Sequence, residues 1–294
     1  MTNKQTILIT GATGNIGGGA AVAMAKRGAR IVLLGRNLER LEARADSIRK
    51  TLSEAGIKYQ DEDIATLVID LTDMGAVRRA AAEAMNRFPM IHGLNILPNG
   101  HEVMFATNVM GPFLFTKLLL ERLQQSDGLV LHVVAPFYEE IDWDDFESIR
   151  NHNTEIAYNR TKTMNRMILA EFARRYAGKV SSVAFDPTFI IDKNDPELDK
   201  RWPTGFMGFF WRVMALLFAK SPAVAGEPIA DLILSHRDRC AINGAMFKLD
   251  KRIEKPDKAM HDEVSGKRLW DELVRLCALD LSKGEFYMKT IINV

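Results

Sequence analysis

Short apolar runs rich in β-branched residues recur along this chain, and each is followed by a longer stretch with helical periodicity. The runs are nearly continuous in apolar residues, as is typical of strands that are buried on both faces. Strand and helix alternating on this scale predict right-handed βαβ units. We therefore expect an α/β fold with a doubly wound parallel sheet of about seven strands. The runs are TILIT, ARIVLL, IATLVI, LNIL, GLVLHVV, KVSSVAF and AMFKLD.

The chain shows no internal repeat, low-complexity segment or linker-like composition, so we expect a single domain spanning residues 1–294. The strand–helix rhythm is interrupted at about 192–222, where a charged turn precedes a bulky apolar helix. We expect this insertion after the sixth strand to form a lid over a substrate. A C-terminal extension at about 277–294 either docks at a subunit interface or packs on its own domain.

Charge and cysteine content narrow the function classes. The formal net charge is +1, so no long-range field would draw the chain to nucleic acid or to an acidic membrane. Cys240 and Cys277 are not spaced as metal ligands and imply no disulfide framework. The N-terminal residues MTNKQ lead directly into the first strand, without a signal-peptide pattern. We therefore expect a cytoplasmic protein with a small-molecule partner, no metal and no nucleic acid.

Glycines cluster where the first strand meets the first helix, in the stretch TILITGATGNIGGGA. Gly11, Gly14 and Gly17 lie where a tight turn brings backbone N–H groups to a phosphate at the helix N-terminus. Their spacing differs from the usual G-x-G-x-x-G, and a turn needed only for packing is the alternative. Gly18 and Gly19 weaken the helix, which close packing of this helix on the sheet would explain. In this context the loop predicts a Rossmann-type dinucleotide-binding domain.

The residues after the second and third strands indicate which dinucleotide binds. A carboxylate after the second strand would favour NAD, because it pairs with the ribose 2′-hydroxyl. Here the chain reads LLGRN, with Arg36 in that place, Asn37 next and Arg40 one turn further on. Guanidinium groups favour a 2′-phosphate, so we predict NADP(H) over NAD(H); a solvated arginine is the alternative. Asp70 is placed to contact the adenine, and Asp73 fits a helix N-cap equally well.

The stretch YNRTK, from Tyr158 to Lys162, lies inside the helical pattern EIAYNRTKTMNRMILAEFARRY. Residues four apart share a helix face, so we expect the Lys162 ammonium to lower the pKa of the Tyr158 phenol from about 10. Such a phenol can donate or accept a proton near neutral pH. A chance match is common in a chain with five tyrosines, so the placement of the pair decides its meaning. It opens the helix between the fifth and sixth strands, beside the expected nicotinamide site.

These motifs together resemble the short-chain dehydrogenase/reductase family, over nearly the whole chain. TGATGNIG looks like the family's phosphate loop, YNRTK like its active-site Y-x-x-x-K, and MFATNVMGPFLFTKLLLERL like its fourth helix. The segments FFWRVMALLFAKSPAVAGEPIADLIL and DEVSGKRLWDELVRL look like the retinol-dehydrogenase-type branch. The resemblance implies that Tyr158 is the acid/base and that Lys162 binds the nicotinamide ribose and tunes the tyrosine. It also implies that Asn108 helps to hold a proton-relay water.

The same resemblance implies a cofactor site at the junctions between strands and helices. Its predicted residues are Gly11, Thr13, Gly14, Asn15, Ile16, Gly17, Arg36, Asn37, Asp70, Leu71, Asn99, Tyr158, Lys162 and Pro187.

Two departures from the family pattern concern the active site. Residues 97–100, LPNG, replace N-N-A-G, and Ala135 stands where the family has a serine that hydrogen-bonds the substrate carbonyl. Loss of one oxyanion donor costs about 100- to 1000-fold in rate. His132 has an odd offset from Ala135, so we expect it to point to the opposite sheet face in a packing role. Asn99 and Tyr138 escape this restriction, and each either reaches the substrate or is an ordinary loop residue.

The apolar run GFMGFFWRVMALLFA at residues 205–219 is too short to span a bilayer and contains Arg212. Three uses stay open: lining a lid over a bulky apolar substrate, forming the core of that lid, or resting weakly on a membrane surface. The branch that the chain resembles handles hydrophobic alcohols, aldehydes and ketones, which supports the lid. The substrate residues we predict are Ala135, Tyr138, Phe206 and Phe210.

The sequence therefore predicts an NADP(H)-dependent oxidoreductase that transfers hydride between the nicotinamide and a carbonyl or alcohol of an apolar small molecule. We expect it to work as a homodimer or another homo-oligomer. The missing serine keeps two alternatives open. One is a non-redox enzyme on the same fold, such as an isomerase, cyclase or lyase. The other is a dinucleotide-binding regulatory protein with impaired catalysis.

Overall fold

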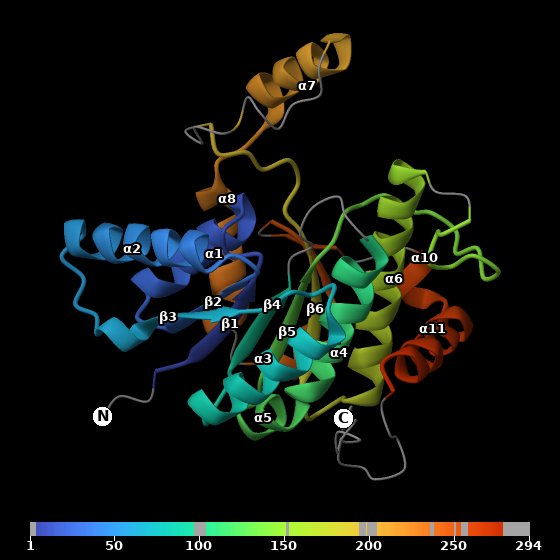
Figure 1. The fold of residues 1–294 in the computed structure, drawn as a ribbon, viewed down its shortest axis with the longest axis horizontal. Coiled ribbons are helices and arrows are strands. Elements are labelled where there is room, and N and C mark those ends of the chain that lie inside the picture. The colour runs from blue at the N-terminus through green and yellow to red at the C-terminus, as the bar shows by residue number, and fades with distance from the viewer. Residues whose placement is uncertain are drawn as a thin grey trace, which may run out of the picture.

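A computed structural model of the chain describes residues 4–96, 104–150, 153–193, 198, 205–235, 238–249, 251–253 and 258–278. Within these residues the strands form one eight-stranded sheet in the order β3-β2-β1-β4-β5-β6-β7-β8 (Figure 1). The strands are β1 (Thr6–Thr10), β2 (Arg30–Gly35), β3 (Ile64–Val68), β4 (Gly93–Ile96), β5 (Leu129–Val133), β6 (Ser181–Asp186), β7 (Met246–Lys248) and β8 (Lys251–Ile253).

All seven predicted strands are present, and β1 to β7 pair in parallel. The structure adds β8, which pairs antiparallel with β7. Its three residues, KRI, are too few and too polar to produce a strand pattern in the sequence. The doubly wound α/β fold is therefore confirmed, with an additional edge strand.

Helices cover both faces of the sheet, and a separate apolar cluster lies under each layer (Figure 1). On one face lie α1 (Asn15–Lys26), α2 (Leu38–Glu54), α8 (Pro222–Ala230) and the short α9 (Arg239–Ile242). On the other lie α3 (Met74–Arg87), α4 (Gly111–Leu118), α5 (Leu120–Gln125), α6 (Thr154–Arg175), α10 (Lys258–His261) and α11 (Glu263–Leu276). The described elements also include two π-helical segments, η2 (Ala106–Met110) and η4 (Asp231–Ser235), and the 3₁₀ turn η1 (Asp61–Asp63).

Gly19 in α1 is required by close packing against a neighbouring helix rather than against the sheet. A Cβ atom at Gly19 would lie 2.4 Å from the carbonyl oxygen of Pro222, and one at Gly226 would lie 2.4 Å from the oxygen of Gly19. The backbones of α1 and α8 therefore touch, and only glycine fits at both positions. The prediction that close packing on the sheet explains Gly19 is wrong: the close partner is α8. This contact fixes α1, and with it the glycine loop.

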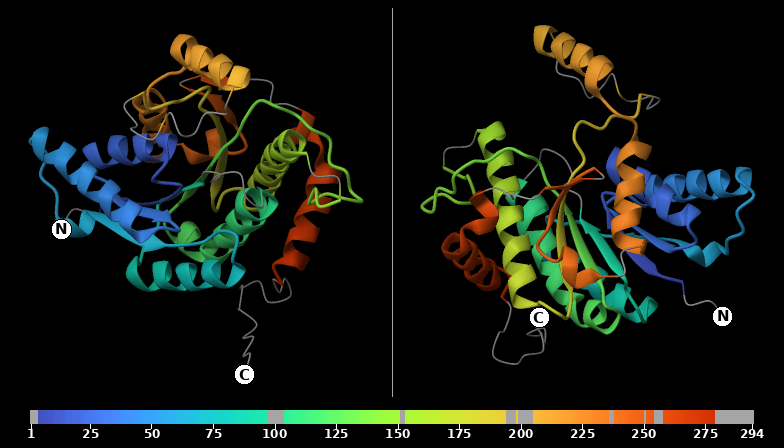
Figure 2. Two further views of the ribbon diagram at one scale, coloured as in Figure 1. Left: turned by 45° about the horizontal axis from the view of Figure 1, so that its top comes forward. Right: turned by 180° about the vertical axis from the view of Figure 1, so that it is seen from behind.

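An apolar helix, α7 (Gly205–Phe218), lies within the predicted insertion after β6. In Figure 1 it stands apart from the sheet and from the helices that cover the sheet. Both views in Figure 2 show the same separation. Of the C-terminal extension, Cys277 and Ala278 are the described residues. The Cys277 thiol is buried beside the carbonyl oxygen of Met110, at an S–O distance of 4.0 Å.

Candidate active site

A cleft of about 890 Å³ opens at the carboxyl ends of the central strands. Sites in doubly wound sheets form at this edge, where the connections leave in opposite directions. The volume lies within the usual range for small-molecule sites, roughly 300–1,000 Å³. Residues from the glycine loop, β5, α6, the segment after β6, and α7 line it. They are Gly11, Gly14, Asn15, Ile16, Gly17, Val133, Val134, Ala135, Pro136, Phe137, Tyr158, Lys162, Asp186, Pro187, Thr188, Phe189, Ile190, Met214, Phe218 and Lys248.

The glycine loop has the geometry of an anion site. Gly11 has φ = 62°, a left-handed conformation that favours glycine, and its carbonyl accepts a hydrogen bond from the Gly14 N–H at 2.9 Å. Gly14 caps α1 without any side-chain hydrogen bond. The first N–H groups of a helix have no partner inside the helix, so a ligand at this end can accept them. The loop therefore fits a dinucleotide diphosphate.

Basic side chains lie on the α2 side of this loop. Arg36 follows β2 and is exposed. Asn37 accepts a hydrogen bond from the Arg40 N–H at 2.9 Å and so caps α2. The sequence reasoning missed Arg44, whose Nη2 donates to the carbonyl oxygen of Thr13 at 3.2 Å. The sequence did offer a signal for Arg44: it follows Arg40 by four residues on α2, and residues three or four apart share a helix face.

The residues after β3 form a turn and a cap. Asp70 accepts hydrogen bonds from the N–H and the hydroxyl of Thr72, at 2.9 and 2.7 Å. Leu71 is buried. Asp73 accepts from the Gly75 N–H at 2.7 Å and caps α3, and backbone hydrogen bonds from Ala76 and Gly75 lower its pKa. Arg36, Asn37, Asp70 and Leu71 do not belong to the described lining of the cleft.

Tyr158 and Lys162 both line the cleft, from the N-terminal half of α6. Asn153 caps this helix, accepting from the N–H groups of Glu155 and Ile156 at 3.0 and 3.1 Å. The Lys162 Nζ lies 5.3 Å from the centroid of the Tyr158 ring and 3.5 Å from the carbonyl oxygen of Val133. The helix therefore presents the pair together, as the spacing predicted.

The predicted effect on the pKa of the Tyr158 phenol is wrong. Burial raises the pKa of Tyr158 above its ordinary value of 10.0. Burial and, second, the charge of Arg166 lower the pKa of Lys162 to about 7. Near neutral pH the lysine is therefore only partly charged, so it cannot offset the cost of removing a phenolate from water.

Arg166 is a buried cation that the sequence reasoning did not identify. It lies one turn beyond Lys162, is fully buried, and donates through Nη2 to the carbonyl oxygen of Phe137 at 2.8 Å and through Nη1 to that of Ala135. Ala135 and Phe137 both line the cleft, so these carbonyls belong to its wall. In the sequence, an arginine near the middle of a helix is indistinguishable from a solvated residue.

His132 is buried inside β5 beside Lys162 and is absent from the described lining of the cleft. Burial and, second, the charge of Lys162 lower its pKa to about 4, so the imidazole is neutral at neutral pH. This placement agrees with the packing role that we expected.

Asn108 is buried in the π-helical segment η2. Its Nδ2 donates to the hydroxyl of Thr161 at 3.1 Å, and this hydroxyl donates to the carbonyl oxygen of Tyr158 at 2.7 Å. The Oδ1 of Asn108 is buried and has no hydrogen-bond partner among the described residues. An acceptor left in this way marks a place for an ordered donor such as water.

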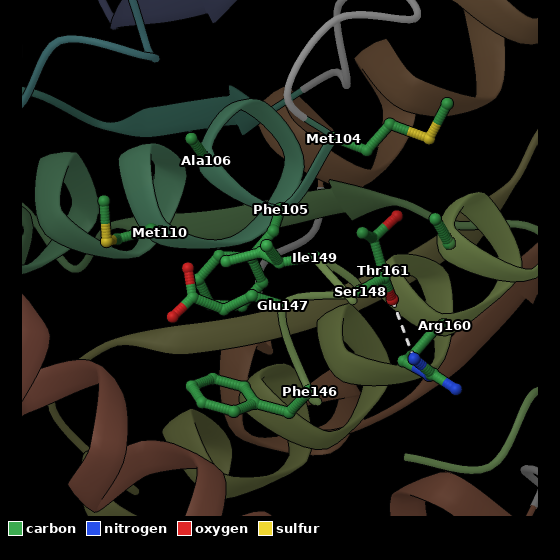
Figure 3. Close-up of a pocket in the computed structure, with 11 residues that line it drawn as sticks. Met104, Phe105, Ala106, Met110, Phe146, Glu147, Ser148, Ile149, Arg160 and Thr161 are labelled. Atoms are coloured by element: carbon green, nitrogen blue, oxygen red, sulfur yellow. Dashed lines mark hydrogen bonds between the residues drawn. The ribbon is translucent and has the colours of Figure 1, made fainter. Parts of the chain in front are cut away.

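A second, smaller cavity of about 260 Å³ lies on the other side of α6 (Figure 3). Ala157, Arg160 and Thr161 face it, whereas Tyr158 and Lys162 face the main cleft. Figure 3 shows the Arg160 guanidinium reaching Ser148, whose hydroxyl oxygen accepts from Nη1 at 2.7 Å. This bond ties the segment before α6 to the helix that carries Tyr158 and Lys162.

The predicted substrate residues differ in whether they line the cleft. Ala135 lines the cleft. Tyr138 lies outside the lining, with the Lys258 Nζ 5.5 Å from its ring centroid. Phe210 is exposed and outside the lining, while the side chain of Phe206 lies outside the described residues. Among the described side chains of α7, Met214 and Phe218 line the cleft instead. Asn99 and the LPNG stretch also lie outside the described residues.

Thr188 follows the predicted cofactor residue Pro187 in the cleft wall. It has φ = 63°, a left-handed conformation that threonine rarely adopts, and its N–H donates to Asp186 at 2.9 Å. Its hydroxyl oxygen is buried and has no hydrogen-bond partner among the described residues. Backbone strain of this kind is concentrated at functional sites.

Comparison with known proteins agrees with this geometry. A family model described as short chain dehydrogenase matches residues 5–137. Retinol dehydrogenase 14 of Mus musculus is 28% identical over 289 residues, which cover 92% of this chain and 85% of the relative. Retinol dehydrogenase 13 of Homo sapiens is 28% identical and covers 94% and 85%. These findings support the short-chain dehydrogenase/reductase family, with likeness to its retinol dehydrogenases.

Solved structures share the fold at lower identity. A polyketide ketoreductase variant solved with NADPH has a TM-score of 0.64 at 17% identity, covering 85% of this chain and 97% of that one. An alcohol dehydrogenase from Thermococcus sibiricus has a TM-score of 0.62 at 18% identity, covering 87% and 100%. These two structures show the fold alone, whereas the family model and the retinol dehydrogenase relatives support an NAD(P)-binding oxidoreductase. In the described part of the chain, no helix is both long and apolar enough to cross a membrane.

Proposed function

We propose that this short-chain dehydrogenase/reductase uses NADP(H) to interconvert a carbonyl and an alcohol on an apolar small molecule. One observation carries the proposal: the glycine loop and the pair Tyr158 and Lys162 line the same cleft. A diphosphate on the loop and a reacting group beside the phenol can therefore belong to a single bound complex.

The residues present fit the dinucleotide. The N–H groups at the start of α1 would donate hydrogen bonds to the diphosphate, with Gly11 and Gly14 leaving room for it. Arg36 and Arg44, at the α2 side of the loop, favour a cofactor with a 2′-phosphate, because guanidinium pairs with phosphate by charge and by forked hydrogen bonds. When bound, this group supplies or accepts the hydride.

The proton of the reaction would come from Tyr158. Its raised pKa keeps the phenol protonated, so it can donate to a carbonyl oxygen as negative charge develops there. Lys162, with its pKa lowered to about 7, can re-supply that proton at neutral pH. Arg166 keeps a guanidinium group behind the wall formed by residues 135–137. It acts as a positioning residue, because its Nη1 and Nη2 donate to the backbone carbonyls of Ala135 and Phe137.

The cleft favours an apolar substrate. Phe137 and Phe189 stand at the ends of neighbouring strand connections, and Met214 and Phe218 approach from α7. Aromatic and thioether side chains bind apolar groups without requiring a fixed hydrogen-bond pattern. Since Ala135 offers no hydroxyl, a substrate carbonyl would depend on the phenol for its principal side-chain donor.

Replacing Tyr158 by phenylalanine tests the mechanism. The rate of NADPH oxidation with a panel of apolar aldehydes and ketones should fall at least about 100-fold, because one positioned general acid usually accelerates a reaction by at least this factor. Binding of NADPH, measured by calorimetry, should persist. Tyr59→Phe, at a half-buried tyrosine outside the cleft, is the matched control and should leave turnover unchanged. Undiminished turnover in Tyr158→Phe would exclude this mechanism.

Ala135 favours one second candidate. A cleft without the hydroxyl donor suits proton transfer by Tyr158 without net redox change, as in an isomerase, cyclase or lyase. Product mass separates the two candidates. Hydride and proton transfer change the substrate mass by two hydrogens, whereas isomerisation leaves the mass unchanged.

A further inference from the structure

The wall of the cleft carries an exposed lysine that the proposed mechanism does not use. Among the described lining residues, Lys162, Asp186 and Lys248 have an amine or a carboxylate. Lys162 is buried beside Tyr158 and belongs to the proposed reaction centre. Asp186 is also buried, and its Oδ1 accepts a hydrogen bond from the Thr188 N–H at 2.9 Å. Lys248 is exposed, so its ammonium group is available to a ligand in the cleft.

The strand order places Lys248 far from the dinucleotide loop. The glycine loop follows β1, whereas Lys248 is the last residue of β7. The strands β4, β5 and β6 lie between them. Neighbouring strands are about 4.8 Å apart, so four such spacings separate β1 from β7 by roughly 19 Å. This separation exceeds the reach of a lysine side chain, so a diphosphate on the loop is not the group that Lys248 would bind.

Lys248 lies closer to the proposed reaction centre. The Lys162 Nζ is 3.5 Å from the carbonyl oxygen of Val133, the last residue of β5. One strand, β6, separates β5 from β7, which puts these two strands about 10 Å apart. A substrate that reacts beside Tyr158 can therefore reach Lys248 with a second group about 10 Å from its reacting carbon.

The surroundings of Lys248 favour a negatively charged group. Phe189, Ile190, Met214 and Phe218 give this part of the cleft an apolar lining. In the part of the chain that the structure describes, Lys248 has no carboxylate as an ion-pair partner, although Asp186 is its neighbour in the sheet. A cleft with low-dielectric walls attracts an opposite charge more strongly than an open surface does.

We propose that the cleft selects apolar carbonyl compounds that also carry a carboxylate, and that Lys248 binds this carboxylate. The substrate class is an oxo acid, or the corresponding hydroxy acid, with about 10 Å between its reacting carbon and its carboxylate. The carboxylate takes no part in the transfer of hydride and proton, so Lys248 determines specificity. The reaction of this substrate rests on the proposed function, whereas the binding of a carboxylate at Lys248 does not.

Calorimetry with unreactive ligands tests the binding. The probes are octanoate and octanamide, which have similar shape and differ in charge, and each is titrated into the full chain with NADPH. The wild type should bind octanoate about fivefold more tightly, since an ion pair in contact with water contributes less than a buried one. Lys248→Met should remove this preference, and Lys248→Arg should keep it because the charge is retained.

The matched control is Lys179→Met, at an exposed lysine that precedes β6 at the opposite edge of the sheet. This variant should bind both ligands as the wild type does. Circular dichroism and the affinity for NADPH show whether each variant is folded.

Turnover tests the selection during the reaction. The substrates are a ten-carbon oxo acid whose ketone lies beside the terminal methyl group, and the amide of this acid. The wild type should oxidise NADPH with a kcat/KM about fivefold higher for the acid. Lys248→Met should remove the difference through KM, with kcat nearly unchanged, because Lys248 does not touch the reacting atoms.

Three results would overturn the proposal. The first is a wild type that binds octanoate no better than octanamide. The second is a Lys248→Met variant that keeps the preference. The third is a loss of NADPH affinity in Lys248→Met as large as its loss of octanoate affinity, because Lys248 would then be a cofactor residue. A wild type that prefers octanoate but oxidises NADPH with neither substrate would support the carboxylate site and contradict the proposed function.

Discussion

Replacing Arg166 by methionine removes a fully buried guanidinium one turn beyond Lys162. The pKa of Lys162 is about 7 in the folded chain, against an ordinary value of 10.5, owing to burial and to the charge of Arg166. Between these two values the unfolded chain holds a proton that the folded chain has released. The folded state therefore gains stability as the pH rises through this window, by at most about 1.4 kcal/mol per pH unit from this one group.

In the Arg166→Met variant the pKa of Lys162 should move up toward its ordinary value, so the slope of stability against pH becomes shallower. The variant also leaves the carbonyls of Ala135 and Phe137 without their buried donor, at a cost of about 1–3 kcal/mol each. We therefore expect the variant to unfold more easily by about 2–5 kcal/mol at pH 9, with a smaller deficit at pH 7.

Urea unfolding followed by tryptophan fluorescence between pH 7 and 9 measures both effects. Arg166→Lys is the informative companion, because it keeps the charge and loses the forked pair of donors. It should preserve the slope and lose stability. The window ends at pH 9 because burial raises the pKa of the Cys277 thiol from 9.0 to about 12, so this group destabilises the folded state as the pH rises further. Equal slopes in the wild type and Arg166→Met would refute the reasoning.

Three other perturbations test the packing around the site. Lys117→Met should also reduce the slope of stability against pH over the same window. Burial and, second, the charge of Arg175 lower the pKa of Lys117 to about 7, so its replacement removes one group that titrates there. The same urea series measures this slope. Gly19→Ala should lower the free energy of unfolding by about 1–3 kcal/mol, seen as a lower Tm, because its Cβ meets the Pro222 carbonyl; an unchanged Tm would contradict the helix contact. Thr188→Gly should raise stability by about 1 kcal/mol through relief of the left-handed backbone, whereas Thr188→Ser should not, and equal Tm values for the two would argue against strain.

The sequence predicted the features that depend on residues close together in the chain. Nearly continuous apolar runs marked the seven parallel strands, because strands buried on both faces have no polar alternation to obscure them. The glycine loop was predictable because Gly11 needs a positive φ, which few other residues adopt. Tyr158 and Lys162 were predictable because one helix carries both, so their spacing fixes their relation.

The features that the sequence could not reveal depend on contacts between distant segments. Arg166 became significant only when the fold placed the carbonyls after β5 against α6. The error over the pKa of Tyr158 has the same origin, since desolvation depends on how completely a group is covered. For α7, helical spacing allowed an apolar face but not its direction. The structure places Met214 and Phe218 in the lining of the cleft and Phe210 outside it.

Transfer of deuterium tests the central claim most directly. The enzyme is incubated with apolar aldehydes or ketones and with NADPH that carries deuterium at the transferred position of its nicotinamide. Mass spectrometry then measures the masses of the products. The account predicts an alcohol that carries one deuterium on the former carbonyl carbon, formed by the wild type and lost in Tyr158→Phe. A product that has the mass of its substrate, or that contains no deuterium, would contradict it.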